Sequence, residues 1–256
     1  MKFATAAVLS ALICAEAVLA AVPADRGLAR RLARRQGRRS APFRNNTEHA
    51  TVQSNWGGAI IESSGFSTVS AVANVPRGSG GSNAAGTAWV GIDGANCQTA
   101  ILQTGFDWYG DGTYDAWYEW YPEFSSDFTG IDISEGDQIQ MSVTATSKTS
   151  GSATLENLST GQKVTQNFNH VTAGSLCLTD AEFIIEDFEE CNSSGTSCQP
   201  VTFSPFSPAI KFTQATATAN GRNIPLSQGE ITEVIINNRD VTDCSISGST
   251  LTCESV

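Results

Sequence analysis

The stretch QIQMSVTAT, residues 138–146, alternates apolar and polar side chains at every second position. Successive side chains of a strand point to opposite faces, so the apolar half of this stretch falls on one face. TVSAVANVP, residues 68–76, has the same period. Both stretches predict β-strands that have one face buried and the other exposed to water. Their apolar members are Ile139, Met141, Val143 and Ala145, and Val69, Ala71, Ala73 and Val75.

Short apolar or alternating runs recur along the chain between turns rich in Gly, Ser, Asn, Asp and Pro. They are TAWVGI, AILQTGF, AWYEWYP, SATLEN, KVTQNF, EFIIEDF, AIKFTQATA and EVIIN. No convincing helical period exceeds two turns, and neither a repeat nor a linker divides the region. The pattern predicts a single all-β sandwich domain over residues 51–256.

The first 50 residues differ in composition and are expected to be removed. Residues 1–20 combine Lys2, an apolar stretch and a small-residue ending, which is typical of a signal peptide. The apolar stretch is shorter than the roughly 20 residues that a membrane anchor needs. Residues 21–50 contain eight arginines and few large apolar side chains, which favours a basic propeptide over a nucleic-acid binding segment. We therefore expect a secreted, extracellular protein with no membrane or nucleic-acid partner.

The predicted mature domain is strongly acidic. Residues 51–256 contain six Lys and Arg against 23 Asp and Glu, a formal net charge of −17. Because so few cations are present, the domain has little ion-pair stability to lose in acid, which predicts acid tolerance. An acidic surface that serves only solubility is the alternative. The basic propeptide is expected to bind this domain as an inhibitor and to loosen as the carboxylates are protonated.

Six cysteines remain in this domain, an even number that indicates disulfides in an exported chain. They are Cys97, Cys177, Cys191, Cys198, Cys244 and Cys253. Cys191 with Cys198 and Cys244 with Cys253 each bracket a turn rich in Ser and Gly, which leaves Cys97 with Cys177. This pairing is favoured among the several that six cysteines allow. Zinc binding is not expected, because no C-x-x-C spacing occurs.

Histidine is scarce, since only His170 remains once the propeptide is removed. Serine and cysteine triads use a histidine base, and the G-x-S-x-G and H-E-x-x-H motifs are absent. No metal or other cofactor is expected. The chemistry that remains is hydrolysis by carboxyl and amide groups.

Two polar residues that follow apolar runs are the candidate catalytic groups. Glu186 follows the run FII, and such surroundings should raise its pKa. If EFIIEDFEE is one strand, Glu186, Phe188 and Glu190 share a face. Gln103 follows the run AIL, where its amide can be available to an oxyanion. The alternatives are a solvated acidic strand and a structurally satisfied amide.

Aromatic side chains cluster with carboxylates in the first third of the domain. Core packing will claim some of them, but a groove lined with rings and carboxylates suits a polymer, either a peptide or a glycan. The residues are Trp56, Trp89, Trp108, Trp117, Trp120, Tyr109, Tyr118 and Tyr121, with Asp93, Asp107, Asp115 and Glu119.

Five motifs occur along the chain in a fixed order: NWGGAII, TAWVGIDG, CQTAILQTGFDWYGDGTYDAWYEWYPE, AEFIIEDFEEC and VIINNRDVTDC. In these motifs, over essentially all of residues 51–256, the chain resembles the fungal glutamic peptidases, or eqolisins. The resemblance implies a concanavalin-like sandwich of two antiparallel sheets and an acid endopeptidase acting on protein or peptide substrates. The family's catalytic glutamine falls on Gln103 and its catalytic glutamate on Glu186. Substrate-binding or supporting roles are implied for Trp56, Trp89, Asp93, Glu119 and Phe188.

The implied mechanism matches the chemistry that the residues permit. Glu186 would take a proton from a water, and the Gln103 amide would stabilise the tetrahedral oxyanion. We expect an optimum below about pH 5. Pepstatin should not inhibit, because the domain has no D-T-G or D-S-G motif from which to build a two-aspartate dyad.

Two other classes of protein share features of this sequence. A concanavalin-like glycosidase would also carry a tryptophan-rich groove, but its alternating acids on one face are not matched by the acids at 186, 187, 189 and 190. A lectin-like binding module would tolerate the loss of Gln103 and Glu186 and would not need a propeptide.

Overall fold

The computed structural model describes residues 37–48, 51–192 and 194–256. The predicted signal peptide and residues 21–36 and 49–50 of the predicted propeptide lie outside the described residues. The described part of the chain is built from strands, with the 3₁₀ turn η1 (Leu226–Gln228) between β20 and β21. Within it, no helix is long and apolar enough to cross a membrane.

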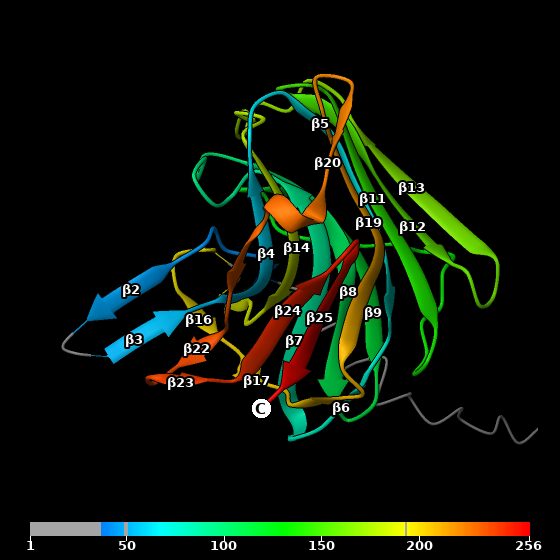
Figure 1. Cartoon of the computed structure of the whole chain (residues 1–256). Helices are drawn as coiled ribbons and strands as arrows, with labels where there is room; N and C mark the ends of the chain where they lie inside the picture. Colours follow the sequence, from blue (N-terminus) through cyan, green and yellow to red (C-terminus); the bar gives the residue numbers. More distant parts are fainter. Residues whose placement is uncertain (1–36, 49–50, 193) are drawn as a thin grey trace, which may run out of the picture. The chain divides into compact units, whose positions relative to one another are not determined.

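Two large sheets dominate the fold, as the alternating sequence predicts (Figure 1). The first sheet has the order β10 (Ser126–Asp127), β9 (Tyr114–Tyr121), β8 (Ile101–Gly110), β7 (Gly81–Ile92), β14 (Asp180–Glu186), β4 (Trp56–Glu62) and β21 (Glu230–Thr232). Its neighbours along this order are antiparallel, and β17 (Thr202–Phe203) adds a parallel pairing to β7.

The second sheet is also antiparallel and contains both stretches whose period two is clearest in the sequence. Its order is β13 (Gln162–Phe168), β12 (Ser150–Asn157), β11 (Gln138–Ser147), β5 (Phe66–Asn74), β19 (Ile210–Ala219), β25 (Thr250–Ser255) and β24 (Thr242–Ser247), with β20 (Arg222–Ile224) paired to β19. In β11 and β12, buried residues alternate with more exposed ones. The predicted all-β sandwich of two antiparallel sheets is confirmed.

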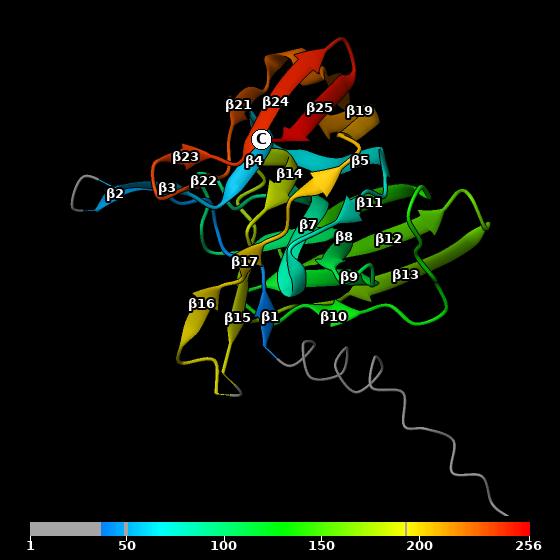
Figure 2. The same ribbon diagram turned by 90° about the horizontal axis from the view of Figure 1, so that it is seen from below.

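Smaller sheets extend this framework. One contains β1 (Arg38–Arg39), β15 (Glu189–Cys191) and β16 (Cys198–Pro200), which Figure 2 shows side by side. Another contains β2 (Asn45–Glu48), β3 (Thr51–Ser54), β22 (Ile235–Ile236) and β23 (Arg239–Asp240). A third pairs β6 (Arg77–Gly78) with β18 (Phe206–Ser207).

The main core lies between the two large sheets. Strands β5 and β11 of the second sheet pack on β7 of the first, and the apolar side chains between them are fully buried. The rings of Phe183 on β14 and Phe212 on β19 meet edge to face, with centroids 6.4 Å apart. Burial of such side chains contributes about 25 cal/mol per Å² of apolar surface, so this interface stabilises the fold.

Three disulfides join the pairs that the cysteine spacing favours: Cys97–Cys177, Cys191–Cys198 and Cys244–Cys253. Cys191–Cys198 closes the β15–β16 hairpin in a small sheet, and Cys244–Cys253 closes the β24–β25 hairpin at the edge of the second sheet. Cys97–Cys177 spans 80 residues and fixes the loop before β14 to the loop after β7. The ends of the first sheet's central strands are therefore held covalently.

Candidate active site

The face of the first sheet that points away from the main core carries buried polar residues. Along β8, Leu102 and Phe106 enter the core, so the alternate residues Gln103 and Asp107 point to the opposite face. Every residue of β8 from Ile101 to Tyr109 is buried. This face is therefore covered, and it combines polar side chains with a buried apolar cluster that includes Trp89, Trp117 and Ile184.

The strand register arranges these residues in rows across the first sheet. Glu186 on β14 lies opposite Thr87 on β7, which lies opposite Asp107 on β8. A second row, four residues away along β7 and β8, contains Glu182, Gly91, Gln103 and Glu119. The row of Trp89 lies between them. The predicted catalytic residues Glu186 and Gln103 thus share a face but stand on strands separated by β7, and no described hydrogen bond joins them.

Glu186 is fully buried and hydrogen-bonded at both carboxyl oxygens. The indole Nε1 of Trp89 donates to Oε2 over 2.8 Å, and the Ala41 N–H donates to Oε1 over 3.0 Å. The Ser40 hydroxyl also donates to Oε2. Burial raises the pKa of Glu186 to about 7, while these hydrogen bonds and the positive charge of Arg38 act in the opposite direction. The sequence predicted a raised pKa for Glu186 from its apolar surroundings, and burial is indeed the main cause of the increase.

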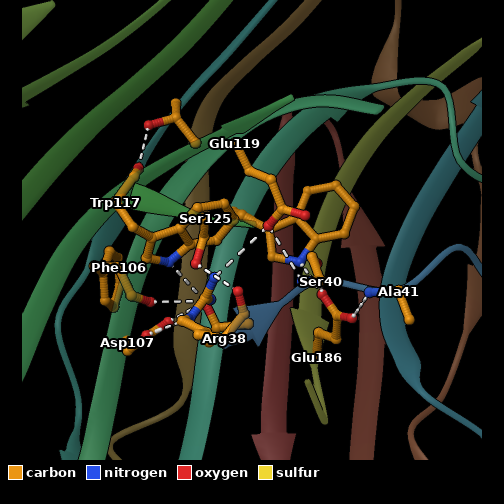
Figure 3. A network of polar contacts seen from close by, with 12 residues as sticks. Arg38, Ser40, Ala41, Phe106, Asp107, Trp117, Glu119, Ser125 and Glu186 are labelled. Atoms are coloured by element: carbon orange, nitrogen blue, oxygen red, sulfur yellow. Dashed lines mark hydrogen bonds and ion pairs between the residues drawn. The ribbon is translucent and has the colours of Figure 1, made fainter. Parts of the chain in front are cut away.

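An N-terminal segment, residues 37–44, covers this carboxyl. It enters through β1, which pairs with β15, and its Arg38 side chain is 4% exposed. The guanidinium donates to both Asp107 carboxyl oxygens at 2.6 Å, which is a bidentate ion pair (Figure 3). It also lies 4.0 Å from the centre of the Trp117 ring and 4.5 Å from that of Phe188. A buried guanidinium held by two charge-assisted bonds and two rings anchors the segment firmly.

Ser40 connects the two carboxyls of the site. Its N–H donates to Glu119 Oε2 over 3.2 Å, and its hydroxyl donates to Glu186 (Figure 3). The next carbonyl, that of Ala41, accepts from the Trp56 indole over 3.0 Å. Burial raises the pKa of Glu119 well above its usual range, and the Arg38 charge opposes this.

Gln103 is fully buried and directly opposite Glu119 in the pairing of β8 with β9. Neither its amide nitrogen nor its amide oxygen has a hydrogen-bond partner among the described residues. A buried amide without partners costs free energy, so proteins retain one where it has a task. Gln103 could be a catalytic donor or an amide whose hydrogen bonds are satisfied within the fold. No described contact supports the second interpretation.

The other predicted site residues divide into two groups. Trp56, Trp89, Glu119 and Phe188 all contact the N-terminal segment or Glu186. Asp93 does not: its carboxylate accepts the backbone N–H groups of residues 177–180, next to the Cys97–Cys177 disulfide. Its contacts anchor that loop, so a substrate-binding role for Asp93 has no support from them.

One prediction from the sequence is wrong. EFIIEDFEE is not a single strand, because β14 ends at Glu186 and β15 begins at Glu189 in another sheet. Glu186 is buried and Glu190 is exposed, so the two do not share a face of one strand. The break turns the Phe188 ring onto Arg38 instead.

The sequence analysis missed Thr87, Arg38 and Ser40 as site residues and named Asp107 only among the carboxylates of a polymer-binding groove. Thr87 accepts hydrogen bonds from Arg38 and from the Trp117 indole, each over 3.1 Å. A signal existed for Asp107, since it lies four residues after Gln103 in a predicted strand and so shares its face. No local pattern could have indicated Arg38, which lies 69 residues before its partner. Among the described residues, no group of three or more His, Cys, Asp or Glu could hold a metal ion.

Known proteins share this fold and sequence. The chain is 67% identical to scytalidopepsin B of Scytalidium lignicola over the full length of both, and 41% identical to aspergillopepsin-2 of Aspergillus niger over 98% and 99% of the two chains. A structure of scytalido-glutamic peptidase with a transition state analog inhibitor is 70% identical, with a TM-score of 0.78, over 79% of this chain and 98% of that one. A structure of SCP-B, an eqolisin, with the tripeptide Ala-Ile-His is 67% identical, with a TM-score of 0.75, over the same shares.

The fold, the buried carboxyl site and these relatives define the chain as a glutamic peptidase. It belongs to the Peptidase A4 family, whose model matches residues 54–255. The resemblance seen in the sequence motifs is confirmed.

Proposed function

We propose that this chain is a secreted acid endopeptidase that hydrolyses peptide bonds in proteins through Gln103 and Glu186. The observation that carries the proposal is a buried Glu186, held by the Trp89 indole, on the same face as a Gln103 amide without described partners. Relatives solved with a peptide-based transition state analog and with a tripeptide support peptides as substrates. The protein partners are then substrates and, in the precursor, the chain's own propeptide.

Glu186 is the general base in the proposed reaction. Its carboxylate takes a proton from a water, and the water oxygen adds to the scissile carbonyl carbon. The protonated carboxyl then gives that proton to the departing amine as the carbon–nitrogen bond breaks. Trp89, which donates to Oε2, would keep the carboxyl oriented through both steps.

Gln103 stabilises the oxyanion that forms on the former carbonyl oxygen. A neutral amide donor does so at any pH, which suits a domain that works in acid. Because the amide has no described hydrogen-bond partner to give up, its donation to the oxyanion requires no broken bond.

The pKa of Glu186 relates the N-terminal segment to activity. Burial, the largest influence, raises that pKa to about 7 with residues 37–44 in place. Removal of the segment admits water to the carboxyl, which acts to lower this pKa, and takes away the Ser40, Ala41 and Arg38 contacts, which acts to raise it. A general base must be ionised, so the proposal requires the effect of water to be the larger. Pepstatin insensitivity follows from a mechanism that uses no aspartate dyad.

Residues 1–20 are proposed as the signal peptide, 21–50 as the propeptide and 51–256 as the mature enzyme. The contacts of residues 38–41 with Asp107, Glu119 and Glu186 support inhibition by the propeptide. We propose that acid favours release because protonation of the acidic domain weakens its attraction to the basic propeptide as a whole. Burial raises the pKa values of Asp107 and Glu119 with the segment in place, so these two carboxyls do not themselves favour release in acid. Secretion is consistent with the three disulfides.

The test is cleavage of denatured protein at about pH 2 to 5 by acid-matured wild type and by Glu186→Gln, each with and without pepstatin. We expect pepstatin-resistant cleavage by the wild type and a loss of about 10³-fold or more in the variant, because the amide cannot accept the proton. Cleavage that pepstatin blocks, or that survives in a folded Glu186→Gln variant, contradicts the proposed mechanism.

A further inference from the structure

The peptide bond between Ser40 and Ala41 lies against the proposed catalytic carboxyl. The Ala41 nitrogen is 3.0 Å from Glu186 Oε1, which is the distance from which a carboxyl can return a proton to a departing amine. Before the bond, the Ser40 N–H donates to Glu119, and after it the Ala41 carbonyl accepts from the Trp56 indole. The backbone is thus fixed on both sides of this bond.

The Ser40 hydroxyl occupies the position beside Glu186 that hydrolysis requires for the attacking water. Glu186 Oε1 is occupied by the Ala41 N–H, and Oε2 by the Trp89 indole and the Ser40 hydroxyl. A catalytic water must also donate a hydrogen bond to this carboxyl. The serine hydroxyl makes the contact that the water would make.

We propose that Ser40–Ala41 is a latent cleavage site, and that the Ser40 hydroxyl blocks its hydrolysis by replacing the attacking water on Glu186. The proposal rests on the proposed function of Glu186. The hydroxyl makes residues 37–44 an inhibitor, whereas the same backbone without it is a substrate.

The blocked reaction is an ordinary hydrolysis. Water adds to the Ser40 carbonyl carbon and gives one proton to Glu186, the bond to the Ala41 nitrogen breaks, and that nitrogen takes the proton from Glu186. The products are a carboxyl at residue 40 and an amine at residue 41, so water supplies every added atom. The Arg38 anchor lies upstream of the bond and does not change in this step.

Synthetic peptides of residues 37–48 test the proposal on enzyme matured in acid from the full chain. The peptides are the natural sequence, Ser40→Ala, and Asn45→Ala as a control at an exposed position. Casein hydrolysis measures inhibition, and mass spectrometry locates any cut in the peptide. A parallel incubation with Glu186→Gln enzyme shows whether a cut depends on this carboxyl.

We expect the natural and Asn45→Ala peptides to inhibit and to remain intact. The Ser40→Ala peptide lacks the hydrogen bond from the Ser40 hydroxyl to Glu186, so its inhibition should weaken by at most about tenfold. It should also be cut between residues 40 and 41. The Glu186→Gln enzyme should leave it intact. A variant that merely bound more loosely would not be cut at this one bond.

Equal cutting of the natural and Ser40→Ala peptides would overturn the proposal, as would a Ser40→Ala peptide that inhibits unchanged and stays intact. Casein hydrolysis without peptide separates the two levels of inference. If casein is cleaved and the Ser40→Ala peptide is not, the latent site is wrong and the proposed function stands. If matured wild type does not cleave casein, the proposed function fails and the latent site fails with it.

Discussion

The two large sheets use the same strand geometry in opposite ways. In the second sheet, β11 and β12 alternate buried and more exposed residues, whereas every residue of β14 in the first sheet is buried. Polar residues of the second sheet can be satisfied by water on its open face. On the covered face of the first sheet, polar groups must find partners or be retained for chemistry. Matched substitutions in the two sheets should therefore have very different effects.

The largest difference is expected between two glutamines. Gln103→Ala removes the proposed oxyanion donor from the first sheet and should lower kcat/KM by about 10²- to 10³-fold. Gln166→Ala, on β13 of the second sheet, should leave it within about twofold. Casein hydrolysis in acid measures both variants, and circular dichroism checks their folding. Equal activities would remove Gln103 from the mechanism.

The next difference concerns two cations in the full-length precursor. Arg38→Gln leaves the buried Asp107 without its bidentate partner, so activity before acid treatment should rise about tenfold or more. Lys163→Gln breaks an exposed pair with Glu156 on the second sheet, and such pairs contribute little. A fluorogenic peptide assay at mildly acidic pH gives both values. Unchanged latency in Arg38→Gln would show that the guanidinium does not hold the segment.

Two threonines compare stability rather than activity. Thr87→Val removes a buried acceptor from the Trp117 indole and should lower the free energy of unfolding by about 1–3 kcal/mol. Thr154→Val, in the Thr154–Thr165 pair of the second sheet, should change it by less than about 0.5 kcal/mol. Urea unfolding at one pH provides the measurement. A larger loss from the second substitution would reverse the comparison.

The smallest effect is a shift in thermal stability with pH. Burial raises the pKa of Glu182 well above the 4.5 of an unfolded chain. Between those two values the unfolded chain releases this proton and the folded chain keeps it, so stability is full in acid and falls as pH rises. Replacing the Glu182 carboxyl with a neutral amide should reduce the loss of folding stability as pH rises.

Glu182→Gln should therefore raise Tm above that of wild type at about pH 7.5 and leave it nearly unchanged at about pH 3.5; each kcal/mol corresponds to roughly 2–4 °C. Glu156→Gln, on the second sheet, should change Tm by less than about 2 °C at either pH. Scanning calorimetry gives the four differences from wild type. A Glu182→Gln variant less stable at the higher pH would mean that the carboxylate is satisfied there.

The second sheet could be predicted well from the sequence. Its apolar residues recur at every second position, because one face is buried and the other is exposed to solvent. The strands of the first sheet could be recognised, but not the break after Glu186, because local propensity in EFIIEDFEE continues through it. Glu186 and Gln103 were found as polar residues in apolar runs. Arg38 and Ser40 were not, since their partners are 69 and 146 residues away and only the folded sheet brings them close. Asp93 was predicted to line the groove, because a carboxylate that accepts backbone N–H groups from a distant loop leaves no pattern in the sequence.

The Cys191–Cys198 disulfide also matters when one copy of this peptidase cuts another. The hairpin that it closes has exposed residues at its tip, where self-digestion would begin. A single cut there leaves both new ends attached to the same two strands, β15 and β16. A cut at this exposed tip therefore produces a nicked chain that is still one covalent molecule, because the disulfide joins the part that carries Gln103 and Glu186 to the part that contains β19, β24 and β25.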